Sequence, residues 1–338
     1  MSKKTISTLV QLVIFLGLGI GLIIWRYDTM DVPQKAAMFH AFGHVRWWWA
    51  GPVFIVGFLS HYFRALRWKL LLKPLNIYPT TANTTFAVLI GYLANALIPR
   101  LGEVAKCTVL AKYEDVPADK MVGTIIAERA FDMVCLVAIL FITLALQYDI
   151  IYPFARDLYA RIFLDDLGNF LWLRIGAAIL VIVAGFYLLI RLARKTKDSK
   201  FGKILKGIGE GLKAIGRIRQ KGLFFLWTFM VWAMYISLAI IGFWAIPEMD
   251  GITLLAGLSV IVFGSVGMIV TPGGIGAYPV IVAQVLLLYG INEGVGLAYG
   301  WVSWAAQTAI VVVLGVASLI LLPLYNRKKH EAERRVSS

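Results

Sequence analysis

Charged residues are scarce in this sequence, and their scarcity argues against a soluble fold. Only 15% of the 338 residues are Asp, Glu, Lys or Arg, whereas 60% are hydrophobic and the mean hydropathy is +0.78. A soluble domain could not hide that much apolar surface from water. Several apolar stretches reach about 18 residues, the length that a membrane-spanning helix needs. We therefore expect an all-α polytopic membrane protein.

Cysteine, histidine and catalytic motifs are also rare or missing. The two cysteines, Cys107 and Cys135, fall in apolar segments and imply no disulfide framework. The four histidines have no metal-ligand spacing, so we predict neither a metal nor another cofactor. The enzyme motifs HExxH and GxSxG are absent from the sequence, and we do not expect an enzyme with a familiar catalytic motif.

Positive charge is the one kind of charge in excess, with a formal net charge of +14. The excess lies mainly in loops and in the C-terminal tail, which is the distribution that positive-inside topology produces. We therefore expect no nucleic-acid partner. The N-terminal "MSKK" precedes an apolar run that has no small-residue cleavage site, which favours a retained first span over a signal peptide.

The apolar stretches and the Lys/Arg bias together predict a topology. The acidic loop 148–169 is expected outside, whereas the basic loop 191–221, the tail 324–338 and both termini are expected in the cytoplasm. This pattern indicates a multi-pass protein of the cell inner membrane. The six predicted full spans are 8–25, 48–72, 120–147, 170–191, 222–246 and 297–323.

Two apolar segments, 82–112 and 254–290, do not fit this count. Charge bias requires each segment to leave and re-enter on the same side of the membrane. The parts after Gly102 and Gly276 would form helices of roughly 16 and 21 Å, too short for a hydrocarbon core of about 30 Å. We predict two re-entrant hairpins, broken at the midplane by Pro and Gly. The alternative is that both are buried packing elements.

The predicted elements follow the same order in residues 1–147 and 170–323, namely span, span, hairpin, span. Three full crossings in each half make the second half inverted relative to the first. Interrupted hydrophobic segments at matching positions of inverted halves are a sequence pointer to a transporter's binding site.

The stretch "IPRLGEVAK" at 98–106 places charges in the first predicted hairpin. Pro99 breaks the helix and Gly102 lets the chain turn, while Arg100 projects at the break. Glu103 falls in the first turn of the next helix, where the dipole favours an anion. Lys106 is a further member of this charged group.

The span that follows adds "ERAFD", in which Glu128 and Asp132 are four residues apart and share a helix face with Arg129 nearby. Five such charges, counted with Arg100 and Glu103, would cost on the order of 12–18 kcal/mol if they were unpaired in the membrane. They must therefore pair or be hydrated. They either handle a substrate headgroup or protons, or form a structural ion-pair cluster.

The second predicted hairpin contains "TPGGIGAYP" at 271–279, which carries no charge. Its glycines leave backbone amides uncovered before a helix that starts near Gly276 with Pro279 in its first turn. Such amides can bind phosphate or carboxylate. The alternative is a glycine-rich turn that serves only packing.

Four motifs in this order resemble the flippase-like family of the lysylphosphatidylglycerol synthase transmembrane region: "RALRW" at 64–68, "N-x-x-x-P-R-x-G-E" at 95–103, "E-R-x-x-D" at 128–132 and "T-P-G-G-I-G" at 271–276. The sequence departs from a common family pattern in which an acid follows the last motif, since Pro279 stands there. From the charge pattern and the resemblance we expect these substrate-binding residues: Arg64, Arg67, Asn95, Arg100, Glu103, Lys106, Glu128, Arg129, Asp132, Thr271, Gly273, Gly274, Gly276 and Tyr278.

The resemblance implies an inner-membrane protein that moves polar lipids between leaflets, such as an anionic phospholipid or a lipid-linked saccharide. Fused family members carry a soluble aminoacyltransferase domain after the membrane part, and we expect none here. Two alternatives stay open. One is an accessory subunit beside a separate lipid-modifying enzyme or glycosyltransferase, and the other is an intramembrane headgroup-modifying enzyme with Glu128 or Asp132 as base.

Overall fold

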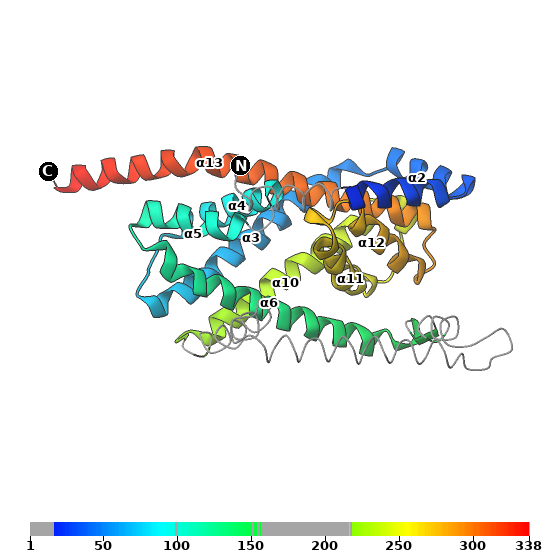
Figure 1. The fold of residues 1–338 in the computed structure, drawn as a ribbon, viewed down its shortest axis with the longest axis horizontal. Coiled ribbons are helices and arrows are strands. Elements are labelled where there is room, and N and C mark those ends of the chain that lie inside the picture. The colour runs from blue at the N-terminus through cyan, green and yellow to red at the C-terminus, as the bar shows by residue number, and fades with distance from the viewer. Residues whose placement is uncertain are drawn as a thin grey trace. The chain divides into compact units, whose positions relative to one another are not determined.

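Helices make up the regular secondary structure in the part of the chain that the structure describes. The computed structural model describes residues 17–98, 101–150, 152, 153, 156, 216 and 218–337, and these ranges contain no β-strand (Figure 1). The all-α prediction is therefore confirmed for the described part of the chain. The α-helices are 17–29, α2 Val32–Gly43, α3 Ala50–Leu72, α4 Thr81–Leu97, α5 Leu101–Glu114, α6 Ala118–Leu146, α10 Lys221–Trp244, α11 Ala256–Val270, α12 Ala277–Leu287 and α13 Glu293–Ser337.

The chain forms two compact units. The first comprises residues 1–125 and 215–338, and the second comprises residues 126–214. Most of α6 lies in the second unit, where residues 148–150 are again helical after a turn at Gln147. All packing described below, except where α6 is named, belongs to the first unit.

Polar side chains set where two of the helices begin. Asp31 precedes α2, and its carboxylate accepts a hydrogen bond from the Gln34 backbone N–H over 2.8 Å while the Gln34 side chain accepts one from the Asp31 N–H over 3.1 Å. Thr80 precedes α4 and accepts a bond from the Asn83 N–H. Such caps satisfy amides that have no partner within the helix.

Helices α3 and α10 pack antiparallel. At one end the rings of Trp49 and Trp244 lie 5.4 Å apart, and at the other end the Lys73 ammonium donates to the side chain of Gln220 over 2.6 Å. These two contacts mark the two ends of the helix bundle, which we call the Trp49–Trp244 end and the Lys73–Gln220 end.

Helices α4 and α5 form an antiparallel hairpin. Near the tip, Gly91 and Gly102 lie so close that a Cβ built on Gly91 would meet the Gly102 carbonyl oxygen at 2.9 Å. At the base, the Glu114 carboxylate accepts hydrogen bonds from the Thr80 N–H at 2.8 Å and the Asn83 amide at 2.7 Å. The predicted break is confirmed, since α4 ends at Leu97 and α5 begins at Leu101.

Helices α11 and α12 form a second antiparallel hairpin. Gly267 lies against the backbone of Tyr278 near the tip, and the hydroxyls of Ser259 and Tyr289 share a hydrogen bond of 2.6 Å at the base. The turn between the helices covers residues 271–276, which is where the sequence predicts the break. Aromatic and aliphatic side chains of α2 and α10–α13 form the adjoining apolar core.

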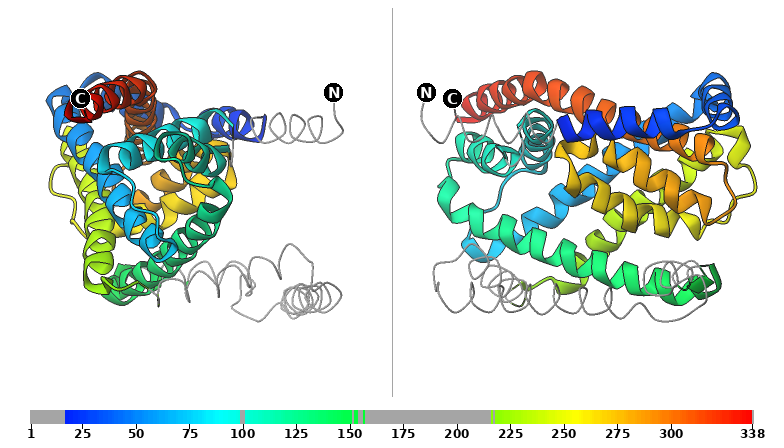
Figure 2. Two further views of the ribbon diagram at one scale, coloured as in Figure 1. Left: turned by 90° about the vertical axis from the view of Figure 1, so that its left-hand side faces the viewer. Right: turned by 45° about the vertical axis from the view of Figure 1, so that its right-hand side comes forward.

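Helix α13 contacts both hairpins, each along a different part of its length (Figures 1 and 2). Its N-terminal part runs antiparallel to α12, where Gly296 lies on Ala283 and Gly300 lies on Pro279. Its C-terminal part runs antiparallel to α4: Gly315 lies against Leu93, and the Asn326 amide donates to the side chain of Asn83 over 2.8 Å.

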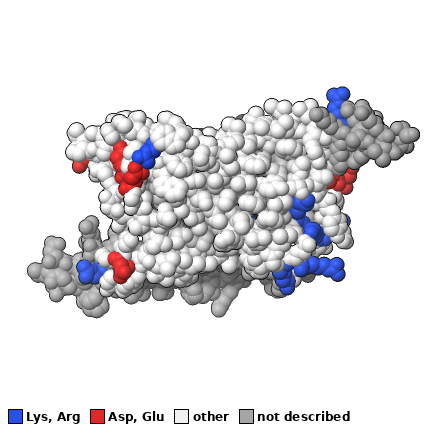
Figure 3. Space-filling view, turned by 180° about the vertical axis from the view of Figure 1, so that it is seen from behind, with Lys and Arg blue, Asp and Glu red and all other residues white. Residues whose placement is uncertain are grey.

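Three of the described helices are long and apolar enough to cross a membrane, namely Ala118–Leu146, Lys221–Trp244 and Glu293–Arg327. They coincide with three predicted spans. The predicted span 48–72 is helix α3, which is not among the three and carries His61, Arg64 and Arg67. On the face in Figure 3, uncharged atoms cover the middle, and charged side chains gather toward its edges. This is the distribution expected of a surface that meets hydrocarbon.

Several predicted features lie outside the described residues. These are the fourth span 170–191, nearly all of the loop 191–221, most of the external loop 148–169, the first half of the span 8–25, and Pro99 with Arg100.

Candidate functional site

Three buried cations gather at the end of α3 that lies beside Lys73. Arg64 and Arg67 lie on α3, and Lys106 comes from the middle of α5. Only 5%, 0% and 8% of their surfaces are exposed. Buried cations are costly unless their surroundings compensate for lost hydration, so the contacts of these three side chains decide what the site can do.

Aromatic and hydroxyl groups surround the two arginines. The Arg64 guanidinium donates to the Tyr235 hydroxyl over 2.8 Å and lies 5.6 Å from the centre of the Tyr92 ring. The Arg67 guanidinium donates to the Thr228 hydroxyl over 3.5 Å and lies 5.9 Å from the Phe224 ring. Such π faces contribute to stabilising a desolvated cation.

Trp68 joins Lys106 to this end of α3. The Lys106 ammonium lies 4.0 Å from the centre of the Trp68 ring, and the indole N–H of Trp68 donates to the Thr124 hydroxyl over 2.9 Å. His61, one turn before Arg64, is buried beside Tyr92, with ring centres 4.4 Å apart. We refer to Arg64, Arg67 and Lys106 with their aromatic neighbours as the cation cluster.

The tip of the first hairpin is closed by Asn95. Its side-chain oxygen accepts a hydrogen bond of 2.7 Å from the backbone N–H of Gly102, which lies in the first turn of α5. Glu103 also lies in this first turn and is half-buried, as expected for an anion at a helix N-terminus. Arg100, the charge predicted at the break itself, lies outside the described residues.

The charges of α6 lie on different faces of that helix. Glu128 is 2% exposed and Asp132 is half-buried, whereas Arg129 is exposed. The two carboxylates therefore share a face, as their spacing of four residues predicts. Their helix supplies a buried carboxylate within the second unit.

The tip of the second hairpin is a turn that requires glycine. Gly273, Gly274 and Gly276 have φ of +65°, +75° and +74°, a region that other residues rarely adopt. The Thr271 hydroxyl donates to the Ile275 carbonyl over 2.9 Å, and the Gly274 N–H donates to the Thr271 carbonyl over 2.9 Å. Hydrogen bonds within the turn thus hold its shape.

The two faces of this turn differ in their surroundings. Gly276 packs directly on the backbone of Gly19, whereas Gly273 is exposed and has open space around its Cα. The Tyr278 hydroxyl accepts a hydrogen bond of 3.4 Å from the side-chain amide of Gln307, which lies on α13. Close packing therefore accounts for Gly276, and Gly273 is the glycine of the turn that is open to a ligand.

Sequence reasoning identified the cations but missed their partners. The sequence analysis did not predict four site residues that contact these cations: Tyr92 and Tyr235 beside Arg64, Thr228 beside Arg67, and Trp68 beside Lys106. A buried group at the base of the second hairpin was missed as well: Glu293 forms an ion pair with Arg26 and accepts from Gln34 over 3.2 Å. Neither Arg26 nor Glu293 belongs to any of the four motifs.

Comparisons with known proteins agree on one membrane family. The sequence model described as "Lysylphosphatidylglycerol synthase TM region" matches residues 8–315. A UPF0104 membrane protein of Pyrococcus horikoshii is 28% identical over 297 residues, which cover 78% of this chain and 83% of the relative. A UPF0104 membrane protein of Methanocaldococcus jannaschii is 30% identical over 122 residues, which cover 36% of this chain and 48% of the relative. No solved structure matches the chain significantly.

Proposed function

Because the chain belongs to the lysylphosphatidylglycerol synthase transmembrane-region family, we propose that it moves a polar or anionic lipid, or a lipid-linked headgroup, between the leaflets of the inner membrane. The observation that carries the proposal is the convergence of two broken hairpins on the middle of α13. The cation cluster supplies a polar site beside the first of them.

The four hairpin helices are too short to span the membrane. They contain 17, 14, 15 and 11 residues, whereas about 20 residues are needed to cross the hydrocarbon core. Irregular backbone at membrane depth is tolerated where protein or a watery cavity surrounds it. Two re-entrant hairpins account for both features.

The contacts with α13 support entry of these hairpins from opposite sides. From Glu293 to Trp304, which contacts the tip of the second hairpin, α13 rises about 16 Å. From Gly315, which contacts Leu93 near the tip of the first hairpin, to Asn326 at its base, α13 rises about 16 Å as well. Trp304 and Gly315 are themselves about 16 Å apart along α13, so in a membrane about 30 Å thick, with its midplane between these two residues, each contact would lie within about 8 Å of the midplane.

The charge pattern suggests which end of the bundle faces the cytoplasm. The end with Lys73 and Gln220 adjoins the basic loop 191–221, and the end with Trp49 and Trp244 adjoins the acidic Glu248 and Asp250. By the positive-inside rule the first end is cytoplasmic and both chain termini are on that side. The cation cluster then lies in the cytoplasmic half of the membrane.

The cation cluster is suited to an anionic headgroup. Arg64 and Arg67 lie about 12 and 8 Å from the cytoplasmic end of α3. A guanidinium can hold a phosphate with two parallel charge-assisted hydrogen bonds, which an ammonium cannot do. In this account Lys106 adds a third positive charge.

Reconstitution of the pure protein tests the proposal. Vesicles containing a headgroup-labelled phosphatidylglycerol would be assayed for exchange of the label between leaflets and for chemical change of the lipid. The proposal expects exchange of an unaltered lipid. A modified lipid would instead indicate a headgroup-modifying enzyme, and neither result would indicate an accessory subunit.

A further inference from the structure

A pocket of about 450 Å³ lies between helix 17–29, α2, α12 and α13, at the end of the bundle opposite the cation cluster. Its volume is within the range of small-molecule sites in proteins. Most of its wall is apolar. The apolar lining consists mainly of Ile23, Met38, Phe42, Val280, Leu297 and Trp301.

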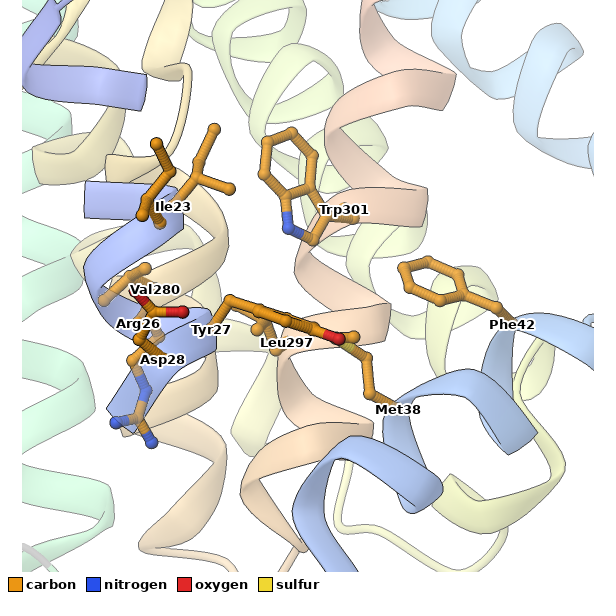
Figure 4. Close-up of a pocket in the computed structure, with 10 residues that line it drawn as sticks. Ile23, Arg26, Tyr27, Asp28, Met38, Phe42, Val280, Leu297 and Trp301 are labelled. Atoms are coloured by element: carbon orange, nitrogen blue, oxygen red, sulfur yellow. The ribbon is translucent and has the colours of Figure 1, made fainter. Parts of the chain in front are cut away.

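The pocket has one polar side. Figure 4 shows Arg26 and Asp28 together at one side of the hollow, with Trp301, Met38 and Phe42 facing it from elsewhere. The Arg26 guanidinium forms an ion pair with Glu293 and donates to the Thr29 hydroxyl over 3.0 Å. The charged groups thus lie at the edge of the pocket, and apolar side chains line most of the rest.

The depth of the pocket matches the hydrocarbon of one leaflet. Leu297 and Trp301 lie about 6 and 12 Å along α13 from Glu293, where the helix begins. A single leaflet contributes about 15 Å of hydrocarbon. α13 is one of the three described helices that are long and apolar enough to cross a membrane, and such a position would surround the pocket with lipid chains.

We infer that this pocket binds one hydrocarbon chain of a membrane lipid, with the headgroup at the Arg26–Asp28 side. The distribution of polarity is that of an amphiphile, apolar through the body and charged at one end. The inference goes beyond the proposed function, since a chain can bind here whether or not the protein moves lipid between leaflets.

Photo-crosslinking tests the site. The full chain would be reconstituted in phosphatidylglycerol vesicles that contain a phosphatidylglycerol with a diazirine in the middle of one acyl chain. After irradiation, adducts are mapped by peptide mass spectrometry. We expect them to concentrate on 23–28, 38–42 and 297–301. Adducts spread equally over exposed apolar positions such as Phe229 would overturn the inference.

Occluding variants sharpen the test. Leu297→Trp, at a buried lining position, should lower the adduct yield at least fivefold per folded molecule. Val280→Phe, at a half-buried lining position on α12, should lower the adduct yield in the same way. It replaces Leu297→Trp in the test if that variant does not fold. Leu319→Trp is the matched control on an exposed part of α13 and should leave the yield unchanged. Unchanged yield in a folded occluding variant would contradict the inference.

Leaflet exchange measured in the same vesicles separates this inference from the proposed function. Concentrated adducts without exchange would support the pocket and contradict the transport proposal. Leaflet exchange without concentrated adducts would support the transport proposal and contradict the lipid-chain pocket.

Discussion

The indole nitrogen of Trp304 donates a hydrogen bond to the carbonyl oxygen of Gly273 over 2.7 Å. This bond joins the tip of the second hairpin to the middle of α13. The Trp304 ring also lies edge-on to Trp301, with ring centres 5.6 Å apart, and Trp301 lines the apolar pocket. One residue of α13 therefore links the glycine turn to the wall of the pocket.

Replacing this indole should loosen the hairpin tip. Trp304→Phe keeps an aromatic ring but removes the N–H, and it should lower the free energy of unfolding by about 1 kcal/mol. Trp48→Phe, at a position that is 70% exposed, should change it little. Thermal unfolding in detergent measures both. Equal stability of the two variants would show that the Trp304 bond contributes nothing.

The close approach of α4 and α5 makes Gly102 intolerant of a side chain. The Cβ of Gly102→Ala would overlap the Gly91 carbonyl oxygen, and we expect a loss of about 1–3 kcal/mol of stability. Gly123→Ala is the matched control, because its Cβ would meet nothing within 4 Å in a helix that favours alanine over glycine. The melting temperature should fall for the first variant and stay level or rise for the second. The reverse order would contradict the packing of the hairpin.

Single cysteines test the proposed orientation in the membrane. Cys107 and Cys135 are first replaced, and a cysteine is then placed at Trp48 or Tyr78, both of which are 70% exposed. A membrane-impermeant thiol reagent should label Trp48→Cys in intact cells and Tyr78→Cys only after permeabilisation. Labelling of both from the same side would refute the assignment of the two ends.

The ion pair between Arg46, which precedes the short helix Trp47–Trp49, and Asp250, which follows the short helix Pro247–Met249, should make stability depend on pH in acid. Side-chain hydrogen bonds from Arg46, of 2.9 and 2.5 Å, lower the pKa of Asp250 below its ordinary value and outweigh the opposing effect of desolvation. Because the folded-state pKa is the lower one, the contribution is present above the ordinary aspartate pKa and is lost as pH falls through the folded value. Arg46 stays protonated throughout.

Asp250→Asn should therefore unfold at a slightly lower temperature than wild type at pH 7. The difference should be small, because the pair is exposed, and it should vanish once the pH has fallen through the lowered folded-state pKa of Asp250. Asp149→Asn, at another exposed position, serves as the control. A difference between Asp250→Asn and wild type that persists unchanged in acid would rule out this ionic contribution.

Much of the helical pattern could be predicted because its signals are local. The lengths of apolar runs located both ends of α6 and α10 to within two residues and the start of α13 to within four, although α13 continues to Ser337, 14 residues beyond the predicted span. Pro and Gly within such runs located the breaks at 98–100 and 271–276. A break is encoded where it occurs, since Pro removes a helix hydrogen bond and Gly permits positive φ.

The partners of the charged residues could not be predicted because they are distant in the chain. Arg64 and Tyr235 are 171 residues apart, and Gln34 and Glu293 are 259 residues apart. Spacing along one helix identifies residues that share a face, as for Glu128 and Asp132. It does not identify which helix that face meets, and this depends on the packing of the whole bundle.

Leaflet exchange per folded molecule is the most direct test of the central claim, that buried arginines beside broken hairpins hold an anionic headgroup. The variants Arg64→Lys, Arg67→Lys and Arg100→Lys keep the charge but lose the guanidinium fork. Arg46→Lys, in the exposed pair with Asp250, is the control. The amount of folded protein in the vesicles would be measured for each variant by size-exclusion chromatography after extraction.

Loss of one bidentate phosphate contact should lower exchange roughly tenfold, which corresponds to about 1.4 kcal/mol. We predict this loss for Arg64→Lys and Arg67→Lys, and for Arg100→Lys if the headgroup passes the first hairpin tip, with Arg46→Lys unchanged. Arginines with a purely structural role would instead lower the amount of folded protein. Undiminished exchange per folded molecule in both Arg64→Lys and Arg67→Lys would contradict the account.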